Sequence, residues 1–161
     1  MTCLFELSIA LLITLLNGFF VMAEYSLVRI RKSRLDELIR QGKSRASTVL
    51  KMSEKLDTYL SATQLGITAS SLLLGWFGGP LLAEMFRGMF GISAGSWYDH
   101  SLVFACAFLI IVFLHVVFGE LVPRTIALGK VEQVAMAVAY PLVFFHYLLY
   151  PLVVLFNRIA H

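Results

Sequence analysis

The chain has 161 residues, of which 59% are hydrophobic and 14% are charged. Soluble domains carry about 25% charged residues, so this composition excludes an ordinary soluble domain and indicates an integral membrane protein of one domain. The net charge of +3 is unevenly distributed, because nine of the thirteen Lys and Arg residues lie between residues 29 and 55. Beside a spanning helix, such a cluster marks the cytoplasmic side and does not indicate nucleic-acid binding. Cys3 and Cys106 have neither zinc-binding nor redox spacing.

The first predicted element is a membrane-spanning helix over residues 4–30. Its apolar run is preceded by Glu6 and followed by the basic cluster, the reverse of a secretory signal, so we expect it to stay in the protein with its N-terminus outside. Asn17 and Glu24 are seven residues apart and share one helical face, and Ser26 follows near the inner end. Polar residues on one stripe of a spanning helix face other helices. Asn17 and Glu24 are therefore predicted either to form a second, sodium-type site or to hydrogen-bond between helices.

Residues 33–57 are too polar to span a membrane. Leu35, Leu38 and Ile39 repeat at helical spacing among Lys, Arg and Glu, and residues 41–43 have the character of a helix stop. This pattern predicts two short amphipathic helices at the cytoplasmic membrane surface, with their basic residues as lipid-facing anchors.

A second spanning helix is predicted over residues 58–79. Gly66 and Ser70 are four residues apart on one face, the small-residue pattern that lets helix backbones approach closely. Two interpretations remain open for this face. Either it packs tightly, with its hydroxyls bonded to their own helix, or Ser70, Ser71 and an exposed Gly66 carbonyl line an ion site. The following residues Gly78–Pro80 are predicted to end or kink the helix.

The third predicted spanning helix covers residues 101–123 and ends in an unusual polar turn. Glu120 lies at membrane depth, where a carboxylate costs about 2.5–3.5 kcal/mol, so it is a candidate functional residue. Pro123 has no N–H, so the carbonyl of Gly119 loses its helical donor. A carboxylate and a freed carbonyl supply two oxygen ligands. The alternative is that Glu120 extends to the headgroups or pairs with Arg124.

His115 is predicted to be an interhelical hydrogen-bond partner. A serine protease using Ser70 or Ser71 with His115 would need a Gly-flanked nucleophile that the sequence lacks, so the protein is not expected to be an enzyme. Residues 91–100 are predicted to form an outer loop. The apolar stretch 133–158 is either a fourth span or a bent helix along the inner face of the bundle.

Three blocks in order, NGFFVMAEYSLVRIRKSRLDEL, LSATQLGITASSLLLG and HVVFGELVPRTIAL, carry a resemblance over essentially the whole chain. They resemble the transmembrane domain of the CorC/CNNM (cyclin M) family, whose members are homodimeric membrane proteins implicated in magnesium efflux driven by sodium entry. The resemblance implies an all-α membrane protein, a single transmembrane domain over residues 1–161. It would contain three spanning helices, amphipathic surface helices and a juxtamembrane helix at 133–158, and would form a homodimer.

The resemblance also implies a Mg²⁺ ion between the three spanning helices, largely stripped of water. Carried over by position, its ligands are Ser26, Gly66, Ser70, Ser71 and Glu120. Mg²⁺ prefers about six hard oxygen ligands, and these residues offer a carboxylate, hydroxyls and carbonyls. One difficulty is depth. Ser70 is thirteen residues past the basic loop, roughly 20 Å along a helix, whereas Ser26 and Glu120 lie near the inner surface.

The expected function is therefore Mg²⁺ efflux by alternating access, with Na⁺ as the coupling ion and with hinges at Pro123 and Gly78–Pro80. The alternative is a membrane-embedded Mg²⁺ sensor or scaffold that regulates a separate transporter. We expect a multi-pass protein of the plasma or inner membrane, with the N-terminus outside and the basic loop and C-terminus in the cytoplasm. Family members continue into CBS domains that bind ATP and a C-terminal domain. Neither is found in these residues, so ATP would act only through such domains.

Overall fold

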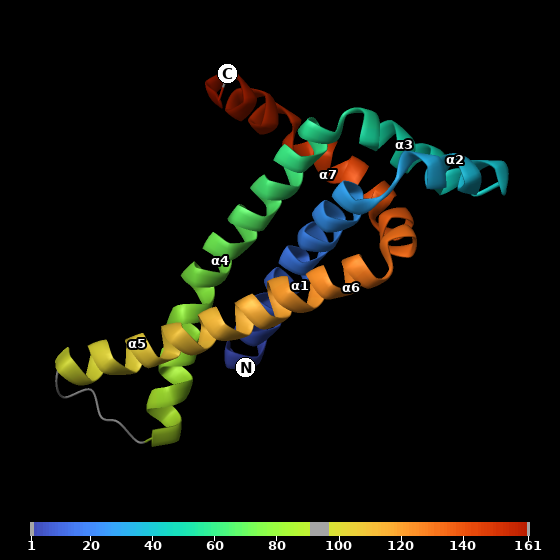
Figure 1. Ribbon diagram of the computed structural model, residues 1–161. Helices are drawn as coiled ribbons and strands as arrows, with labels where there is room; N and C mark the ends of the chain where they lie inside the picture. The colour runs from blue at the N-terminus through green and yellow to red at the C-terminus, as the bar shows by residue number, and fades with distance from the viewer. Residues whose placement is uncertain (1, 91–96, 161) are drawn as a thin grey trace.

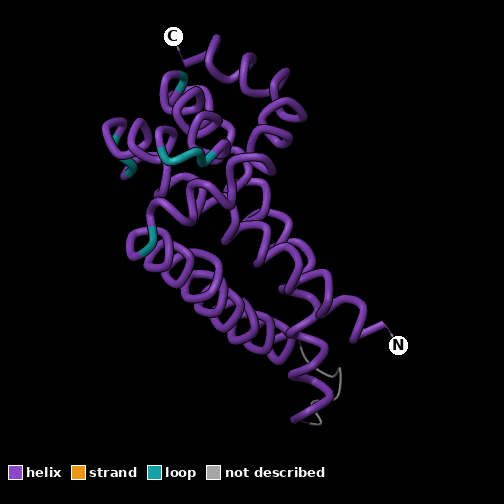
Figure 2. Tube along the Cα trace, turned by 90° about the vertical axis from the view of Figure 1, so that its right-hand side faces the viewer, coloured by secondary structure: helices purple, strands orange, loops and turns teal. Residues whose placement is uncertain are grey.

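The structure is a computed structural model that describes residues 2–90 and 97–160 (Figure 1). Within these residues every element is helical and no strand occurs, which confirms the all-helical prediction. Short loops join the helices (Figure 2). The elements are α1 (Thr2–Arg29), α2 (Lys32–Arg40), α3 (Ser44–Glu54), α4 (Leu56–Phe90), α5 (Trp97–Leu114), the π-helical turn η1 (His115–Leu121), α6 (Val122–Gly129) and α7 (Val131–Ala160).

Within the described residues, three stretches are long and apolar enough to cross a membrane: Phe5–Arg29, Phe108–Gly129 and Val131–Leu155. The chain is therefore a multi-pass membrane protein. These three stretches differ from the three spanning helices that the sequence predicted. Helix α4, which contains the predicted second span, is not among these three stretches of the described residues. Helix α7, predicted to lie at the membrane surface, is among them.

The long helices cross one another and do not form a parallel bundle. In Figure 1, α5, η1 and α6 form one continuous rod that crosses α1 and α4. Helix α1 is central, since it contacts α4, η1, α6 and α7. Helix α7 passes across the ends of α1 and α4, on the side where α2 and α3 lie. This course resembles the predicted bent juxtamembrane helix, whose position relative to the bilayer stays a prediction.

The apolar faces of α2 and α3 are buried inside the protein. Leu35 and Leu38 are three residues apart in α2, as are Val49 and Met52 in α3, and this spacing places each pair on one helical face. All four belong to a hydrophobic cluster that includes Leu142 of α7 and residues of α1. The two short helices are therefore held by α1 and α7, and not by lipid alone.

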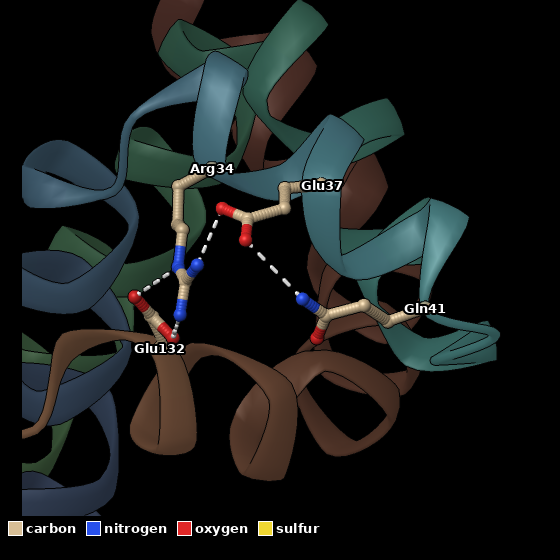
Figure 3. A network of polar contacts seen from close by, with 4 residues as sticks. All are labelled: Arg34, Glu37, Gln41 and Glu132. Carbon is tan, nitrogen blue, oxygen red and sulfur yellow. Dashed lines mark hydrogen bonds and ion pairs between the residues drawn. The ribbon is translucent and has the colours of Figure 1, made fainter.

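Arg34 connects α2 to α7 (Figure 3). Its Nε and Nη2 atoms donate to the two carboxylate oxygens of Glu132 at 2.6 and 3.2 Å, and its Nη1 atom pairs with Glu37. Hydrogen bonds to Glu132 and then Glu37 raise the pKa of the Arg34 guanidinium above its ordinary value. Gln41 donates to the second Glu37 oxygen at 3.2 Å. Arg34 thus binds within the protein, whereas the sequence predicted a lipid-facing anchor.

The structure places several element boundaries differently from the sequence. Helix α4 continues through Gly78–Pro80 to Phe90, so of the two alternatives at these residues the helix end is excluded, and a kink stays a prediction. Of the predicted outer loop 91–100, residues 91–96 lie outside the described residues, and residues 97–100 belong to α5. The third spanning segment also extends beyond Pro123, as far as Gly129.

Candidate functional site

A π-helical turn lies where the sequence placed a proline break. Helix α5 changes to the π-helical hydrogen-bond pattern at His115, and the Val122 N–H donates to the Val117 carbonyl five residues earlier. Helix α6 then begins, with Pro123 at its first turn. Single π-helical turns inside α-helices occur frequently at functional sites. The chain stays helical through Pro123, and the Gly119 carbonyl lacks the donor that a proline cannot supply, as the sequence predicted.

Asn17 of α1 supplies a donor that Pro123 cannot. Its Nδ2 atom donates to the Gly119 carbonyl, four residues before the proline, at 2.8 Å, and the side chain is only 1% exposed. A side chain on Gly119 would meet His115 Nδ1 at 3.0 Å and Asn17 Nδ2 at 3.1 Å. Glycine at this position therefore permits the close approach. For Asn17, the structure shows the interhelical hydrogen bond that the sequence left as one of two alternatives.

Ser71 of α4 and His115 of η1 form a second contact between helices. The Ser71 hydroxyl donates to its own helix at the Ile67 carbonyl (2.9 Å), and its oxygen lies 3.1 Å from His115 Nε2. A hydroxyl has one hydrogen, and with that hydrogen donated to Ile67 the tautomer that fits the second bond is the one in which His115 Nε2–H is the donor. The neutral imidazole then carries its lone pair on Nδ1. The prediction that His115 is an interhelical hydrogen-bond partner is confirmed.

Glu24, Thr63 and Glu120 form a further group, one from each of α1, α4 and η1. The Thr63 hydroxyl donates to the Leu60 carbonyl of its own helix at 2.8 Å, and Thr63 and Glu120 both contribute to the electrostatic surroundings of the Glu24 carboxyl. The sequence interpretation named both carboxylates but did not assign Thr63 to a site. A signal was present, because Thr63 and Ser70 are seven residues apart on α4, the same spacing as Asn17 and Glu24 on α1.

Several buried acceptors in this region have no donor. Asn17 Oδ1, Glu24 Oε2 and His115 Nδ1 are buried without a hydrogen-bond partner among the residues that the structure describes. An unsatisfied buried polar group costs about 1–3 kcal/mol, and native structures contain few of them. All three atoms belong to side chains where α1, α4 and η1 meet. These unpartnered atoms mark the crossing of α1, α4 and η1 as a polar region in the interior of the protein.

The five predicted ligands occupy different surroundings. Ser26 is fully buried and donates to the Ala23 carbonyl at 3.1 Å, Ser70 is 1% exposed, and the Glu120 side chain is exposed. Within the described part of the chain, no hydrogen bond joins any two of the five. Ser71 contacts His115, whereas Glu120 lies five residues further along the chain than His115. The structure thus retains the predicted difference in depth.

Gly66 has a packing role in this structure. A Cβ atom on Gly66 would lie 2.6 Å from atoms of the Phe20 ring on α1. Its absent side chain therefore allows α1 and α4 to approach closely, which is the packing alternative for the small-residue face.

Arg124 does not pair with Glu120 among the described residues. Its guanidinium carbon lies over the Tyr25 ring, 4.6 Å from the ring centroid, in a cation–π contact. The two salt bridges of the described chain are those of Arg34. The alternative in which Arg124 neutralises Glu120 is therefore not present, and the carboxylate keeps its charge available for another partner.

The donor set favours a hard cation. In the residues that the structure describes, no group of three or more His, Cys, Asp or Glu side chains is placed to hold a metal. The polar atoms gathered here are mainly hydroxyl, amide, carbonyl and carboxylate oxygens. Such ligands suit Mg²⁺ better than Zn²⁺, which prefers thiolate and imidazole.

The fold and this polar turn define a multi-pass helical membrane protein with a candidate cation site between crossing helices. Residues 7–161 match the sequence model of the family described as cyclin M transmembrane N-terminal domain. The chain belongs to this family, as the resemblance predicted.

Similar proteins share the sequence over most of this chain. It is 40% identical over 146 residues to the UPF0053 protein YugS of Bacillus subtilis and 42% identical over 153 residues to YhdP of the same organism. It is 38% identical over 153 residues to the uncharacterized protein Rv1841c of Mycobacterium tuberculosis. These alignments cover 90%, 94% and 95% of this chain, but 34%, 34% and 44% of the respective relatives. The chain therefore spans between a third and a half of their length.

Proposed function

We propose that the protein transports Mg²⁺ out of the cell, with the ion held between α1, α4 and η1. The observation that carries the proposal is Glu120, a carboxylate that has no salt bridge among the described residues and lies on a π-helical turn inside an apolar stretch. An acidic residue in such a place is functional by default. Membership in the cyclin M transmembrane family supports magnesium as the ion.

The proposed ligands are the hydroxyls of Ser26, Ser70 and Ser71, the Gly66 carbonyl and the Glu120 carboxylate. Glu120 provides the full charge and the other groups replace water molecules. The ligands lie at two depths, so binding requires Ser71 and Glu120 to approach one another. The η1 turn is the proposed moving element, because its backbone already departs from α-helical bonding. Na⁺ entering from outside is the proposed coupling ion in an alternating-access cycle.

The proposed assembly is a homodimer in the plasma or inner membrane, with the N-terminus outside and α2, α3 and the C-terminus in the cytoplasm. The basic residues of α2 and α3 support this orientation. Cysteines introduced at Ser44 and Ser96, in a background lacking Cys3 and Cys106, should label from opposite sides of the membrane. Labelling from the same side contradicts the orientation.

Flux in liposomes tests the proposal. The purified protein should release trapped Mg²⁺, faster when Na⁺ is supplied on the opposite side, and the Glu120→Gln protein should not. Leu12→Ala is a suitable control, because this side chain is exposed and supplies no proposed ligand. Mg²⁺ binding without flux would contradict transport and would instead indicate the sensor or scaffold that regulates a separate transporter.

A further inference from the structure

We propose that Asn17 and His115 are positioning residues of the cation site. His115 orients the Ser71 hydroxyl, and Asn17 fixes the turn that carries Glu120. This inference rests on the proposed function, since it takes Ser71 and Glu120 as Mg²⁺ ligands. It adds two residues that do not touch the ion and assigns each a specific hydrogen bond.

The Ser71 oxygen has one hydrogen and two lone pairs. The hydrogen is donated to Ile67 and one lone pair accepts the His115 Nε2–H bond. A single lone pair remains, and its direction is set by the other two bonds. His115 therefore aims Ser71 at a ligand. Groups behind the ligands of a metal site commonly orient them in this way.

The Asn17 amide acts on the other ligand through the backbone. Pro123 has no N–H, so it donates to neither the Phe118 nor the Gly119 carbonyl, five and four residues earlier. Asn17 Nδ2 bonds the Gly119 carbonyl at 2.8 Å, and Gly119 directly precedes Glu120 in the chain. The amide therefore ties the Glu120 segment of the turn to α1.

The unpartnered atoms of the same two side chains argue against a purely structural role. Asn17 Oδ1 and His115 Nδ1 are both buried without a donor. Apolar side chains of similar size would fill the space without leaving such acceptors unsatisfied. The amide and the imidazole are thus present for the hydrogen bonds that they donate, to Gly119 and to Ser71.

The test uses variants that move or remove one donor. His115→Gln places an amide N–H near the position of Nε2, His115→Asn places it near the position of Nδ1, and His115→Leu has none. Asn17→Asp keeps the shape of the side chain but loses the N–H. Mg²⁺ affinity is measured by calorimetry on the whole purified chain, together with the melting temperature without Mg²⁺. His146→Leu is the matched control, since this buried histidine also has an unpartnered Nδ1 but lies on α7.

We expect His115→Gln to bind within about threefold of the unchanged protein, and His115→Asn, His115→Leu and Asn17→Asp to bind about 10–100-fold more weakly. The two amide variants at 115 should have similar melting temperatures, and His146→Leu should keep full affinity. Equal affinity for Gln, Asn and Leu at 115, or affinities that only follow the melting temperatures, would overturn the inference. Absence of Mg²⁺ binding by the unchanged protein would overturn the proposed function itself, a result that the variants cannot imitate.

Discussion

The contact between α2 and the start of α7 at Arg34, and the crossing of α1, α4 and η1, treat their polar groups in opposite ways. At the first, Arg34 has carboxylate partners and lies at the surface, while Leu35, Leu38 and Leu142 are fully buried. At the second, buried acceptors of Asn17 and His115 have no partner. Buried polar groups without partners reduce stability. The first region stabilises the fold, whereas the second is the region that we propose binds a cation.

Truncation of the α2 core should give the largest loss of stability. Leu38 is fully buried in the cluster that joins α2, α3, α1 and α7, so Leu38→Ala should lower the free energy of unfolding by about 2–5 kcal/mol. Thermal or denaturant unfolding of the purified protein measures this change. Leu12→Ala, at a 67% exposed position, should change it by less than about 0.5 kcal/mol. If the folded Leu38→Ala protein also lost Mg²⁺ affinity, the claim that the two regions have separate roles would be contradicted.

A methyl group on Gly66 should give a smaller loss of stability than truncation of the α2 core. In Gly66→Ala the new Cβ would lie 2.6 Å from the Phe20 ring, and overpacking of this kind costs about 1–3 kcal/mol. Gly75→Ala is the matched control on the same helix, because nothing lies within 4 Å of its Cβ position. That variant should be neutral or more stable by about 0.5–1 kcal/mol. Equal unfolding midpoints for the two variants would contradict the close contact between α1 and α4.

The surface ion pair of Arg34 should contribute least to the stability of the protein. Arg34→Ala removes the contacts to Glu132 and Glu37 at an exposed site, where ion pairs are screened by solvent and salt. We expect a small decrease in melting temperature at low ionic strength that disappears in concentrated salt. A large decrease that salt does not alter would mean that this contact organises the end region more strongly than its exposure suggests.

The sequence was most informative where one residue violates a local rule. Glu120 in an apolar run, Pro123 in a helix and Asn17 on a spanning face all identified the region of the site. The π-helical turn was not predictable in this way. A proline shows that a carbonyl loses its donor, but the compensation comes from Asn17, which is 102 residues from Gly119 in the chain. Long-range packing, and not local pattern, decides between a break and a wider turn.

The course of α7 was undetermined for a similar reason. Its length and hydropathy satisfy the requirements of a span, so sequence properties alone leave two arrangements open. Its passage across the ends of α1 and α4 depends on contacts with α1, α3, α4 and α6, which no single segment contains. Likewise, the placement of Thr63 beside Glu24 depends on how α1 and α4 pack together.

The most direct test of the central claim is Mg²⁺-dependent protection of purified Glu120→Gln against heat. The substitution keeps the shape of the side chain and removes the only full charge assigned to the ion. Mg²⁺ at one hundred times its dissociation constant should stabilise the unchanged protein by about 2.7 kcal/mol, with a smaller effect of Ca²⁺, and should not stabilise Glu120→Gln. Arg124→Ala should keep the protection, because Arg124 contacts Tyr25. Unchanged Mg²⁺ protection in Glu120→Gln would contradict the account, because the ion would then bind elsewhere or would not need this carboxylate.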